Sequence, residues 1–414
     1  MTDIETHILS LGAQADGIAD VDGETIYVPY VLPGEQVRVA PEEGGRASLV
    51  EVLVPSPDRI SPACPHFTRC GGCTLQHMAP AAYAAWKREQ VAAALKARGI
   101  ETEVAPFVAA PPRSRRRATF ALTRTKKGVT AGYYARGSHD IVLLSECPLV
   151  VPEIERFIPR LGELVQPGLS RRTRASVLVT STLNGLDVAV TGGKPLDGPL
   201  RAELGQHAQA ADVARLSWEG EILAERRMPE IDLSGLRVTL PVGGFLQPTQ
   251  EGEAELIRLV REGVGEARRV VDLFAGCGTF SASLAATAAV HAVESEKPAL
   301  AALERAARTY GPGVGLKPLT TEARDLARRP LLAEELNKFD AIVIDPPRAG
   351  ALAQAEEIAK SKVPVVASVS CNPATFARDA RVLLDGGYLL DCVMPVDQFL
   401  WSAHVELVGI YRRG

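Results

Sequence analysis

The chain downstream of Pro241 alternates short apolar runs with helix-like segments, and this alternation restricts the fold more than any other feature. Four runs are rich in valine, isoleucine and leucine: "RRVVDLFAG", "AAVHAVES", "FDAIVIDPP" and "VPVVASVSC". Such runs are typical of strands covered on both faces, and strands separated by helices form parallel sheets. The last two runs, "YLLDCVMPVDQF" and "HVELVGIYRR", leave no room for a helix between them. We therefore expect a doubly wound α/β sheet that closes with an antiparallel pair of strands.

The length of 414 residues exceeds what one ordinary core holds, so we expect more than one domain. Residues 1–55 alternate apolar and polar residues in short pieces broken by glycine and proline, which predicts a small β-barrel of about five strands. Residues 56–240 mix strand-like and helical segments and predict an α/β central domain. The doubly wound domain then occupies residues 241–414.

Polar residues and glycines stand where the apolar runs of this last domain end. Gly276 and Gly278 in "VVDLFAGCGTFS" allow a tight turn and a close approach to a ligand, as adenosine-binding folds require, although the spacing is not GxGxxG. Glu294 ends the second run, where its carboxylate would accept hydrogen bonds from both hydroxyls of a ribose; a solvated loop carboxylate is the alternative. Asp345 in "IVIDPPRAG" ends the third run, at the edge where open α/β sheets bind ligands.

A cysteine follows the fourth run. Asn372 is typical of a helix cap and Pro373 of a first helical position, so Cys371 should lie at the sheet edge beside the positive end of a helix dipole. That position favours the thiolate. Free cysteines are commonly small buried residues, and this stretch alone leaves the reactive thiol and the packing residue equally open.

Four further cysteines suggest a metal site. They are Cys64, Cys70, Cys73 and Cys147. Seven cysteines in a long chain without a secretion signal argue for metal binding or catalysis rather than disulfides. Four thiolates can hold zinc or an iron–sulfur cluster, and His66 and His77 are possible zinc ligands. We interpret Cys277 and Cys392 as packing residues.

Basic residues gather between Phe107 and His139, where no acidic residue occurs, although the net charge of the whole chain is −4. They are Arg113, Arg115, Arg116, Arg117, Arg124, Lys126, Lys127 and Arg136. Their spacing among apolar residues predicts arginines arrayed along a strand, which fits phosphate binding by a local patch. A solvated basic face is the alternative.

The chain has no run of roughly 18 apolar residues and no secretion-signal pattern at its N-terminus. We therefore expect a cytoplasmic protein without membrane contact. We also expect a monomer without an obligate protein partner.

Four motifs, in order, resemble those of the S-adenosylmethionine-dependent RNA uracil-5 (5-methyluridine) methyltransferases: "VVDLFAGCGTF", "DPPRAG", "SVSCNPATFARD" and "HVELVGIYRR". The stretch "GGFLQPTQ" is similar to the Phe-x-Gln motif of that family, and residues 1–55 resemble the TRAM barrel of many members. The resemblance covers essentially the whole chain. It implies a class I methyltransferase domain that methylates carbon 5 of a specific uridine in RNA, with ribosomal RNA (rRNA) favoured over transfer RNA (tRNA).

The resemblance also assigns roles to residues. It implies Cys371 as the nucleophile that adds to carbon 6 of uracil, and Glu406 as the general base that removes the proton from carbon 5. Burial between Val405 and Leu407 would raise the pKa of this glutamate. The residues implied around the methyl donor or the base are Gln247, Phe274, Thr279, Glu294, Asp325 and Asp345. Members with this cysteine spacing carry a [4Fe-4S] cluster, whose implied ligands here are Cys64, Cys70, Cys73 and Cys147.

Three other functions fit fewer features. RNA cytosine-5 methyltransferases also use a cysteine but resemble "DPPC" where this chain has "DPPR". Amino-directed adenine methyltransferases end the corresponding motif in an aromatic residue that stacks on the base, and Arg348, which could orient the base or a phosphate, argues against them. A non-catalytic iron–sulfur RNA-binding protein would explain the basic stretch and the cysteine cluster but leaves Cys371 and Glu406 without a role.

Overall fold

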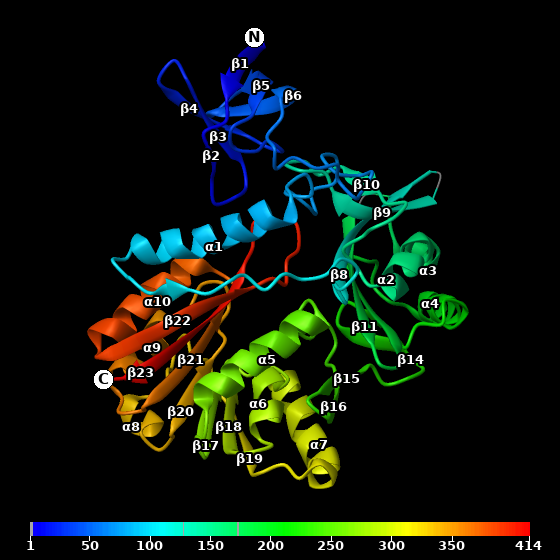
Figure 1. Cartoon of the computed structure of the whole chain (residues 1–414). Coiled ribbons are helices and arrows are strands. Elements are labelled where there is room, and N and C mark those ends of the chain that lie inside the picture. Colours follow the sequence, from blue (N-terminus) through cyan, green and yellow to red (C-terminus); the bar gives the residue numbers. More distant parts are fainter. Residues whose placement is uncertain (1–2, 127, 172–173) are drawn as a thin grey trace.

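The computed structural model describes residues 3–126, 128–171 and 174–414. Lys127 of the basic stretch and the first two residues of the expected barrel therefore lie outside the described residues. The chain forms three successive parts, each built on its own large sheet, with the N-terminal part standing apart from the other two (Figure 1).

The N-terminal part is a six-stranded sheet that wraps around a small apolar core, one strand more than the sequence predicted. Its strands are β1 (Ile4–His7), β2 (Ser10–Leu11), β3 (Gly17–Val21), β4 (Glu24–Val28), β5 (Gln36–Glu42) and β6 (Arg46–Val54). Their order is β1-β5-β6-β4-β3-β2. Val28, Val37 and Val39 are fully buried in this core. The alternation of apolar and polar residues turns one set of side chains inward along each strand.

The central part is a seven-stranded sheet in the order β10-β9-β8-β11-β12-β13-β14. Its strands are β8 (Arg117–Thr125), β9 (Gly128–Tyr134), β10 (Ile141–Leu143), β11 (Arg174–Thr182), β12 (Gly185–Thr191), β13 (Arg215–Trp218) and β14 (Glu221–Glu225). Its helices are α2 (Pro152–Phe157), α3 (Leu161–Val165) and α4 (Gly198–Ala210), with 3-10 turns at Ile158–Arg160 and Gln166–Gly168. Phe157, Leu161 and Leu204 from these helices share one core with Phe120 and Val177 of the sheet.

The C-terminal part is an eight-stranded sheet in the order β19-β18-β17-β20-β21-β23-β22-β7. Its strands are β17 (Arg269–Leu273), β18 (Ala289–Glu294), β19 (Leu319–Ala323), β20 (Ala341–Ile344), β21 (Val365–Ser370), β22 (Tyr388–Val396) and β23 (Glu406–Arg413), joined by β7 (Glu103–Val104). Strands β17 to β21 run parallel to one another, whereas β23 is antiparallel to both β21 and β22. The predicted doubly wound sheet with a closing antiparallel pair is confirmed.

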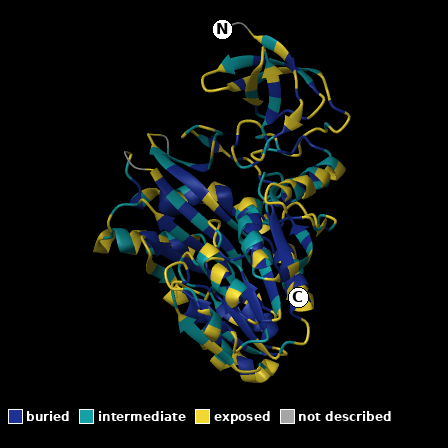
Figure 2. Cartoon of the chain, turned by 90° about the vertical axis from the view of Figure 1, so that its left-hand side faces the viewer, coloured by how far each residue is buried: buried dark blue, intermediate teal, exposed yellow. Residues whose placement is uncertain are grey.

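Helices cover both faces of this sheet. They are α5 (Gln250–Val264), α6 (Thr279–Leu284), α7 (Lys297–Val314), α8 (Ala333–Leu336), α9 (Leu352–Lys360) and α10 (Pro373–Asp385). Ile342 and Ile344 of β20 belong to the core that includes α9 and α10, whereas Ala341 and Val343 belong to the core that includes α5 and α6. Burial on both faces explains the uninterrupted apolar runs, and Figure 2 shows the buried residues concentrated along the strands.

Two elements from the segment 56–240 pack on the C-terminal sheet. Helix α1 (Pro80–Lys96) contributes Val91 and Leu95 to the core that contains α9 and α10, and β7 pairs with β22 in parallel. A hairpin of β15 (Glu230–Leu233) and β16 (Leu236–Thr239) packs against α7. Over the described residues, no helix has the length and apolar content needed to cross a membrane.

Candidate active site

The side chains predicted to surround the methyl donor gather at one edge of the C-terminal sheet. Strands β17, β18, β20 and β21 run parallel, so their carboxyl ends meet at the same edge. The last residues of these strands are Leu273, Glu294, Ile344 and Ser370. The loops that follow them carry most of the predicted site residues, as expected for a ligand-binding α/β sheet.

The loop between β17 and α6 is shaped by two glycines with positive φ angles, 56° at Gly276 and 95° at Gly278. A Cβ atom on Gly276 would meet no atom within 4 Å, so the backbone there borders open space. A Cβ atom on Gly278 would come within 2.5 Å of Leu303, so this glycine lets the loop pack on α7. Phe274 also has a positive φ of 61°, a strained conformation that concentrates at functional sites.

Glu294 fixes this loop from the neighbouring strand. Its Oε2 accepts a hydrogen bond from the N–H of Gly276 at 3.0 Å. Its Oε1 accepts from the N–H groups of Ser295 at 2.6 Å and Glu296 at 2.9 Å. The carboxylate therefore lies beside the open face of Gly276, where a bound ribose would meet both.

Thr279 ends the loop between β17 and α6, and Asp325 lies two strands away, after β19. Thr279 is the first residue of α6 and is partly buried. Asp325 follows β19, is exposed, and accepts hydrogen bonds from the N–H of Ala327 at 3.1 Å and of Arg328 at 3.3 Å. Both stand at the carboxyl edge of the sheet, with Asp325 further toward solvent.

Asp345 connects this edge to a buried chain of amides. Its Oδ2 accepts a hydrogen bond from Nε2 of Gln247 at 3.2 Å, and Oε1 of Gln247 accepts from Nε2 of Gln398 at 2.8 Å. Gln247 and Gln398 are 2% and 1% exposed, so each amide is held in one orientation. Burial, followed by the charge of Asp272, raises the pKa of Asp345 to about 7.

Asp272 in β17 is a member of this acidic group that the sequence reasoning did not single out. It is fully buried, and its Oδ2 accepts a hydrogen bond from Oγ of Ser281 at 2.5 Å. Burial raises its pKa to about 7. The signal that could have found it is a charged residue inside the apolar run "VVDLF", because such residues are seldom buried without a reason.

Cys371 and Glu406 come together through strand pairing. The antiparallel register between β21 and β23 places Ser370 opposite Leu407. Cys371 follows the last paired residue of β21, and Glu406 precedes Leu407 in β23, so the two residues lie at the same end of the strand pair. Glu406 is 3% exposed, while Cys371 is only partly buried. The charge of Glu406 contributes to the raised pKa of Cys371, which agrees with the two side chains lying close together at the sheet edge.

The electrostatic setting of Cys371 differs from the sequence-based expectation. Asn372 does cap α10, because its Oδ1 accepts from the N–H of Ala374 at 3.1 Å. However, burial and then the charges of Glu406 and Asp345 raise the pKa of Cys371 to about 11. The predicted stabilisation of the thiolate is therefore wrong for the protein by itself, since burial and two acidic neighbours outweigh the helix dipole.

The general-base candidate also has a raised pKa. Burial, followed by the charge of Asp345, raises the pKa of Glu406 well above its usual value. This agrees with the direction expected from its apolar neighbours in the strand. A carboxyl group that titrates at a higher pH is a stronger base once it is ionised.

Cationic groups lie beside this acidic cluster. Burial and then the charges of Arg348, Lys87 and Arg115 lower the pKa of His404. Arg348 is exposed, and its carbonyl oxygen accepts a hydrogen bond from Nδ2 of Asn372 at 3.1 Å. The guanidinium of Arg115 lies 5.8 Å from the ring centre of Phe399. Of these cations, Arg348 acts on Cys371, whose pKa its charge lowers against the larger opposing effects.

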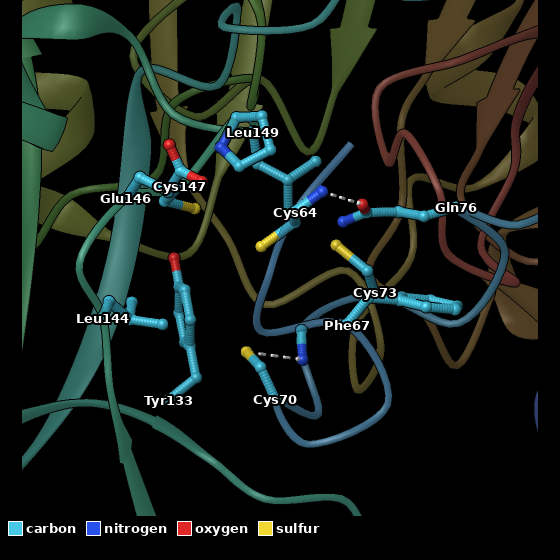
Figure 3. Close-up of a pocket in the computed structure, with 12 residues that line it drawn as sticks. Cys64, Phe67, Cys70, Cys73, Gln76, Tyr133, Leu144, Glu146, Cys147 and Leu149 are labelled. Carbon is cyan, nitrogen blue, oxygen red and sulfur yellow. Dashed lines mark hydrogen bonds between the residues drawn. The ribbon is translucent and has the colours of Figure 1, made fainter. Parts of the chain in front are cut away.

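The four predicted metal-ligating cysteines line a single pocket between the segment after the N-terminal sheet and the central sheet. They are Cys64, Cys70, Cys73 and Cys147. Figure 3 shows their sulfur atoms turned toward a common space, beside the ring of Tyr133. Burial raises the pKa of Cys73 to about 12 and that of Cys147 to about 11. Among the described residues, no group of three or more histidine, cysteine, aspartate or glutamate side chains that could hold a metal ion was found.

The two histidines proposed as zinc ligands point elsewhere. Nε2 of His66 lies 2.9 Å from Oγ of Ser145, and His77 is fully buried with Nε2 3.5 Å from the carbonyl oxygen of Val31. Neither lines the pocket of the four cysteines. Cys277 and Cys392 are apart from the pocket, with Cys277 buried in the core behind the glycine loop.

Much of the basic stretch makes contacts within the chain. Arg113 pairs with Glu155, Arg116 with Glu253, and Arg136 with Asp16. The Arg116 pair joins the central part to α5, and the Arg136 pair joins it to the N-terminal sheet. Fewer basic side chains of this stretch are therefore available to bind phosphate than the sequence suggested. Lys126, by contrast, is exposed at the end of β8.

The sheet order, the glycine loop and the polar residues at the sheet edge define an α/β methyltransferase. A family model described as tRNA (Uracil-5-)-methyltransferase matches residues 236–413. An uncharacterised RNA methyltransferase of Brucella suis biovar 1 (strain 1330) is 49% identical over 410 residues, covering 98% of this chain and 97% of the relative. One of Caulobacter vibrioides is 47% identical over 414 residues, covering 98% and 99%. The chain belongs to the family of these RNA methyltransferases, and its residues 236–413 match the uracil-5 model.

A solved structure shares the fold over nearly the full length. It is the tRNA (uracil-54, C5)-methyltransferase of Pyrococcus abyssi in complex with S-adenosyl-L-homocysteine, with a TM-score of 0.75, 24% sequence identity, and 98% of this chain and 99% of that chain covered. All three parts of the present chain therefore have a counterpart in one known architecture.

Proposed function

We propose that this enzyme methylates carbon 5 of a specific uridine, in ribosomal RNA in preference to transfer RNA, through a covalent bond between Cys371 and carbon 6 of uracil. The observation that carries the proposal is that Cys371 and Glu406 flank the last pair of β21 and β23, Ser370 and Leu407, and that Glu406 and Asp345 lie close enough for their charges to act on Cys371. Methylation of carbon 5 of uracil needs two different groups at the same nucleobase. A nucleophile must first activate the ring, and a general base must then remove the proton from carbon 5.

The reaction balances as follows. Sulfur of Cys371 bonds to carbon 6, and the electrons of the ring double bond move onto the carbonyl oxygen at carbon 4 as an enolate. The enolate carbon 5 then bonds to the donated methyl group as the carbon–sulfur bond of S-adenosylmethionine breaks, leaving neutral S-adenosylhomocysteine. Glu406 takes the proton from carbon 5, the double bond re-forms, and the bond between Cys371 and carbon 6 breaks.

The raised pKa of Cys371 fits an enzyme that activates its thiol only when the donor is bound. The sulfonium of S-adenosylmethionine is positively charged, and a cation beside Asp345 offsets one of the charges that keep the thiol protonated. The exposed side chain of Arg348 adds a second positive charge near the site. The target base, flipped out of its RNA, would then meet a thiolate that forms in place.

The proposed site for the methyl donor lies at the carboxyl edge of the C-terminal sheet. We assign Gln247, Phe274, Thr279, Glu294, Asp325 and Asp345 to the methyl donor or the base. The open space at Gly276 and the adjacent carboxylate of Glu294 fit a ribose that donates two hydroxyl hydrogens. The fixed amide of Gln247, bonded to Asp345, fits a group that orients the reacting end of the donor.

We assign a [4Fe-4S] cluster to Cys64, Cys70, Cys73 and Cys147. The assignment rests on the four thiols lining one pocket and on the resemblance of their spacing to that of cluster-bearing family members. A zinc ion held by the same four thiolates, at about 2.3 Å each, is the alternative. Such a cluster would join the segment before α1 to the loop between β10 and α2, which carries Cys147. Its role would be structural or in positioning RNA.

The three parts would divide the work as the sequence suggested. Residues 1–55 would act as a TRAM-like barrel that binds RNA, residues 56–240 as the cluster-bearing central domain, and residues 241–414 as the catalytic domain. The packing of α1 and β7 on the catalytic sheet means that the central domain and the catalytic domain share an interface. Arg115, Arg117 and Lys126 remain as candidate phosphate ligands.

The decisive experiment uses RNA in which uridine is replaced by 5-fluorouridine. Fluorine at carbon 5 cannot leave as a proton does, so the covalent complex should persist with S-adenosylmethionine present and be absent in Cys371→Ala. A methylated product without any adduct would contradict the proposal.

Mapping of 5-methyluridine in rRNA and tRNA from cells lacking the gene identifies the substrate. If 5-methyluridine is lost from tRNA alone, tRNA is the substrate. tRNA is the second candidate because both the family model and the Pyrococcus abyssi enzyme carry it in their names.

A further inference from the structure

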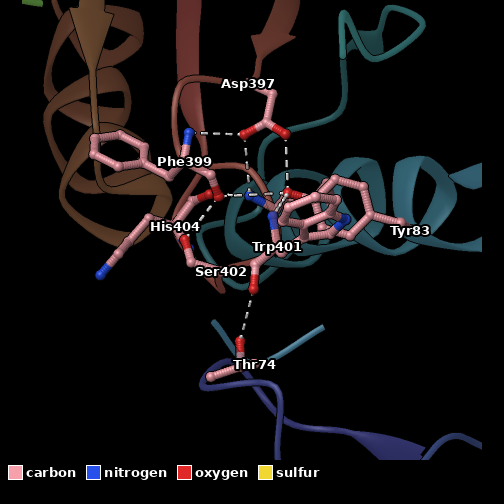
Figure 4. A network of polar contacts seen from close by, with 8 residues as sticks. Thr74, Tyr83, Asp397, Phe399, Trp401, Ser402 and His404 are labelled. Atoms are coloured by element: carbon pink, nitrogen blue, oxygen red, sulfur yellow. Dashed lines mark hydrogen bonds and ion pairs between the residues drawn. The ribbon is translucent and has the colours of Figure 1, made fainter. Parts of the chain in front are cut away.

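The loop between β22 and β23 leads directly into Glu406, and three distant segments hold it. Residues 397–405 begin at Asp397, which is 1% exposed, and end beside the glutamate. Figure 4 shows polar contacts reaching this loop from α1 and from the segment that carries Cys73. A base must be held close to its proton for efficient transfer, so the geometry of this loop bears on the reaction.

Helix α1 supplies the first anchor. The hydroxyl of Tyr83 donates to Oδ2 of Asp397 at 2.9 Å and accepts from the N–H of Trp401 at 3.1 Å. Nζ of Lys87 lies 3.5 Å from Oδ1 of Asp397 and also donates to the carbonyl oxygen of His404. Lys87 is fully buried, in a helix in which seven of the 17 residues are alanine. A buried ammonium and a buried carboxylate are stable only as partners.

The cysteine segment supplies the second anchor. The carbonyl oxygen of Trp401 accepts hydrogen bonds from the N–H groups of Thr74 at 2.7 Å and Leu75 at 3.0 Å. Thr74 follows Cys73 directly. Trp401 itself has a positive φ of 59°, a conformation that persists only where the surroundings impose it.

The loop also reaches the donor side of the site. Gln398 donates to the side chain of Gln247, which in turn donates to Asp345. Residues near the start of the loop therefore orient the amide assigned to the methyl donor, and its end carries the general base.

We propose that Tyr83, Lys87 and Asp397 are positioning residues, which hold the loop 397–405 so that Gln247 and Glu406 keep their places around Cys371. The contacts of Thr74 and Leu75 with Trp401 make the cysteine segment part of the same support. None of these residues touches a reacting atom. Their effect on methyl transfer, which rests on the proposed function, passes through the loop.

The first test measures the loop without measuring activity. Hydrogen exchange of the full-length protein, followed by mass spectrometry, reports the opening of segment 397–406. Tyr83→Phe removes one hydroxyl and its hydrogen bonds with Asp397, Phe399 and Trp401 of the loop, so exchange there should become about 5- to 30-fold faster. Tyr388→Phe is the matched control, because its buried hydroxyl donates to the carbonyl oxygen of Val363 at 2.7 Å at the opposite end of β22. Equal exchange of the loop in both variants would overturn the proposal, whatever the enzyme's activity.

The second test measures the reaction. With RNA and S-adenosylmethionine, Tyr83→Phe should lower kcat by about 10- to 100-fold and leave the KM for RNA within twofold, while Tyr388→Phe changes neither. Unchanged kcat with a loosened loop would also overturn the proposal. If wild-type enzyme methylates no uridine, the proposed function fails, and the exchange result still decides whether the residues hold the loop.

A third variant probes the cysteine side. Cys73→Ser should increase exchange at residues 401–406, whereas Cys392→Ser, in the half-buried middle of β22, should not. Unchanged exchange in Cys73→Ser would contradict a supporting role of the cysteine segment and limit the described anchors to α1 and Gln247.

Discussion

Cys371 and Glu406 stand directly beyond Ser370 and Leu407, the last residues paired between β21 and β23. The thiol that would attack carbon 6 of uracil and the carboxyl group that would deprotonate carbon 5 therefore lie at one sheet edge. Strand pairing fixes the residues next to both groups, and the loop that leads into Glu406 completes the arrangement.

Replacement of the proposed general base, Glu406, should separate methyl transfer from the release of the methylated uridine. Glu406→Gln keeps the shape of the side chain but cannot accept a proton, so release of the methylated base should slow by about 10²- to 10⁴-fold. The covalent complex between Cys371 and ordinary uridine RNA should accumulate and be visible by denaturing gel electrophoresis. The double variant with Cys371→Ala should form no complex. Rapid turnover by Glu406→Gln would show that another group acts as the general base.

Binding of the donor should be linked to protons. The pKa of Asp345 is about 7, and a sulfonium beside it would lower that pKa, so the binding of S-adenosylmethionine should release a proton near neutral pH. The affinity for S-adenosylmethionine relative to uncharged S-adenosylhomocysteine should rise as the pH increases from about 6 to about 8. Calorimetry in two buffers with different ionisation enthalpies checks the proton release. Asp345→Asn should abolish the pH dependence of the ratio, and a constant ratio in wild type would place the sulfonium elsewhere.

Residues of the basic stretch should fall into two classes. Arg116 is paired at 2.6 Å with Glu253, which is 4% exposed, so Arg116→Met leaves a buried carboxyl group without its partner. We expect a loss of about 3 kcal/mol of unfolding free energy, measured by urea denaturation. Lys126→Met, at an exposed position, should leave stability unchanged and reduce the salt dependence of RNA binding by about one charge. The opposite pattern would make Arg116 an RNA ligand.

The four-cysteine pocket should contain iron when the protein is purified without oxygen. We expect about four iron atoms and four inorganic sulfides per chain, from the cluster stoichiometry. Cys147→Ser should lose this iron. Cys392→Ser, the matched control, should keep it. One zinc ion per chain and no sulfide would replace the cluster assignment by a zinc site.

Several features were predictable because they are local. Apolar runs with glycine, glutamate, aspartate or cysteine at their ends predict strands whose carboxyl ends carry polar groups, and a parallel sheet places such ends together. Gly276, Glu294, Asp345 and Cys371 meet at one edge for this reason. The helix cap at Asn372 was also predictable, since its geometry involves only neighbouring residues.

Other features depend on long-range packing. The pKa of Cys371 follows from burial and from Glu406 and Asp345, which a stretch of sequence around residue 371 does not contain. Lys87 would be expected on the exposed face of a charged, alanine-rich helix, yet its partner Asp397 lies 310 residues away.

The alternation of strands and helices, the sheet edge that carries the polar residues and the family to which the motifs point could all be predicted from the amino-acid sequence, because periodicity and strand-end residues act over a few positions. The closeness of Glu406 to Cys371, the contacts of α1 and the cysteine segment with the loop before Glu406, and the pairing of Arg116 with Glu253 became visible only in the folded chain. Register, burial and charge pairing arise between segments far apart in the chain, and their energies exist only once those segments are packed together.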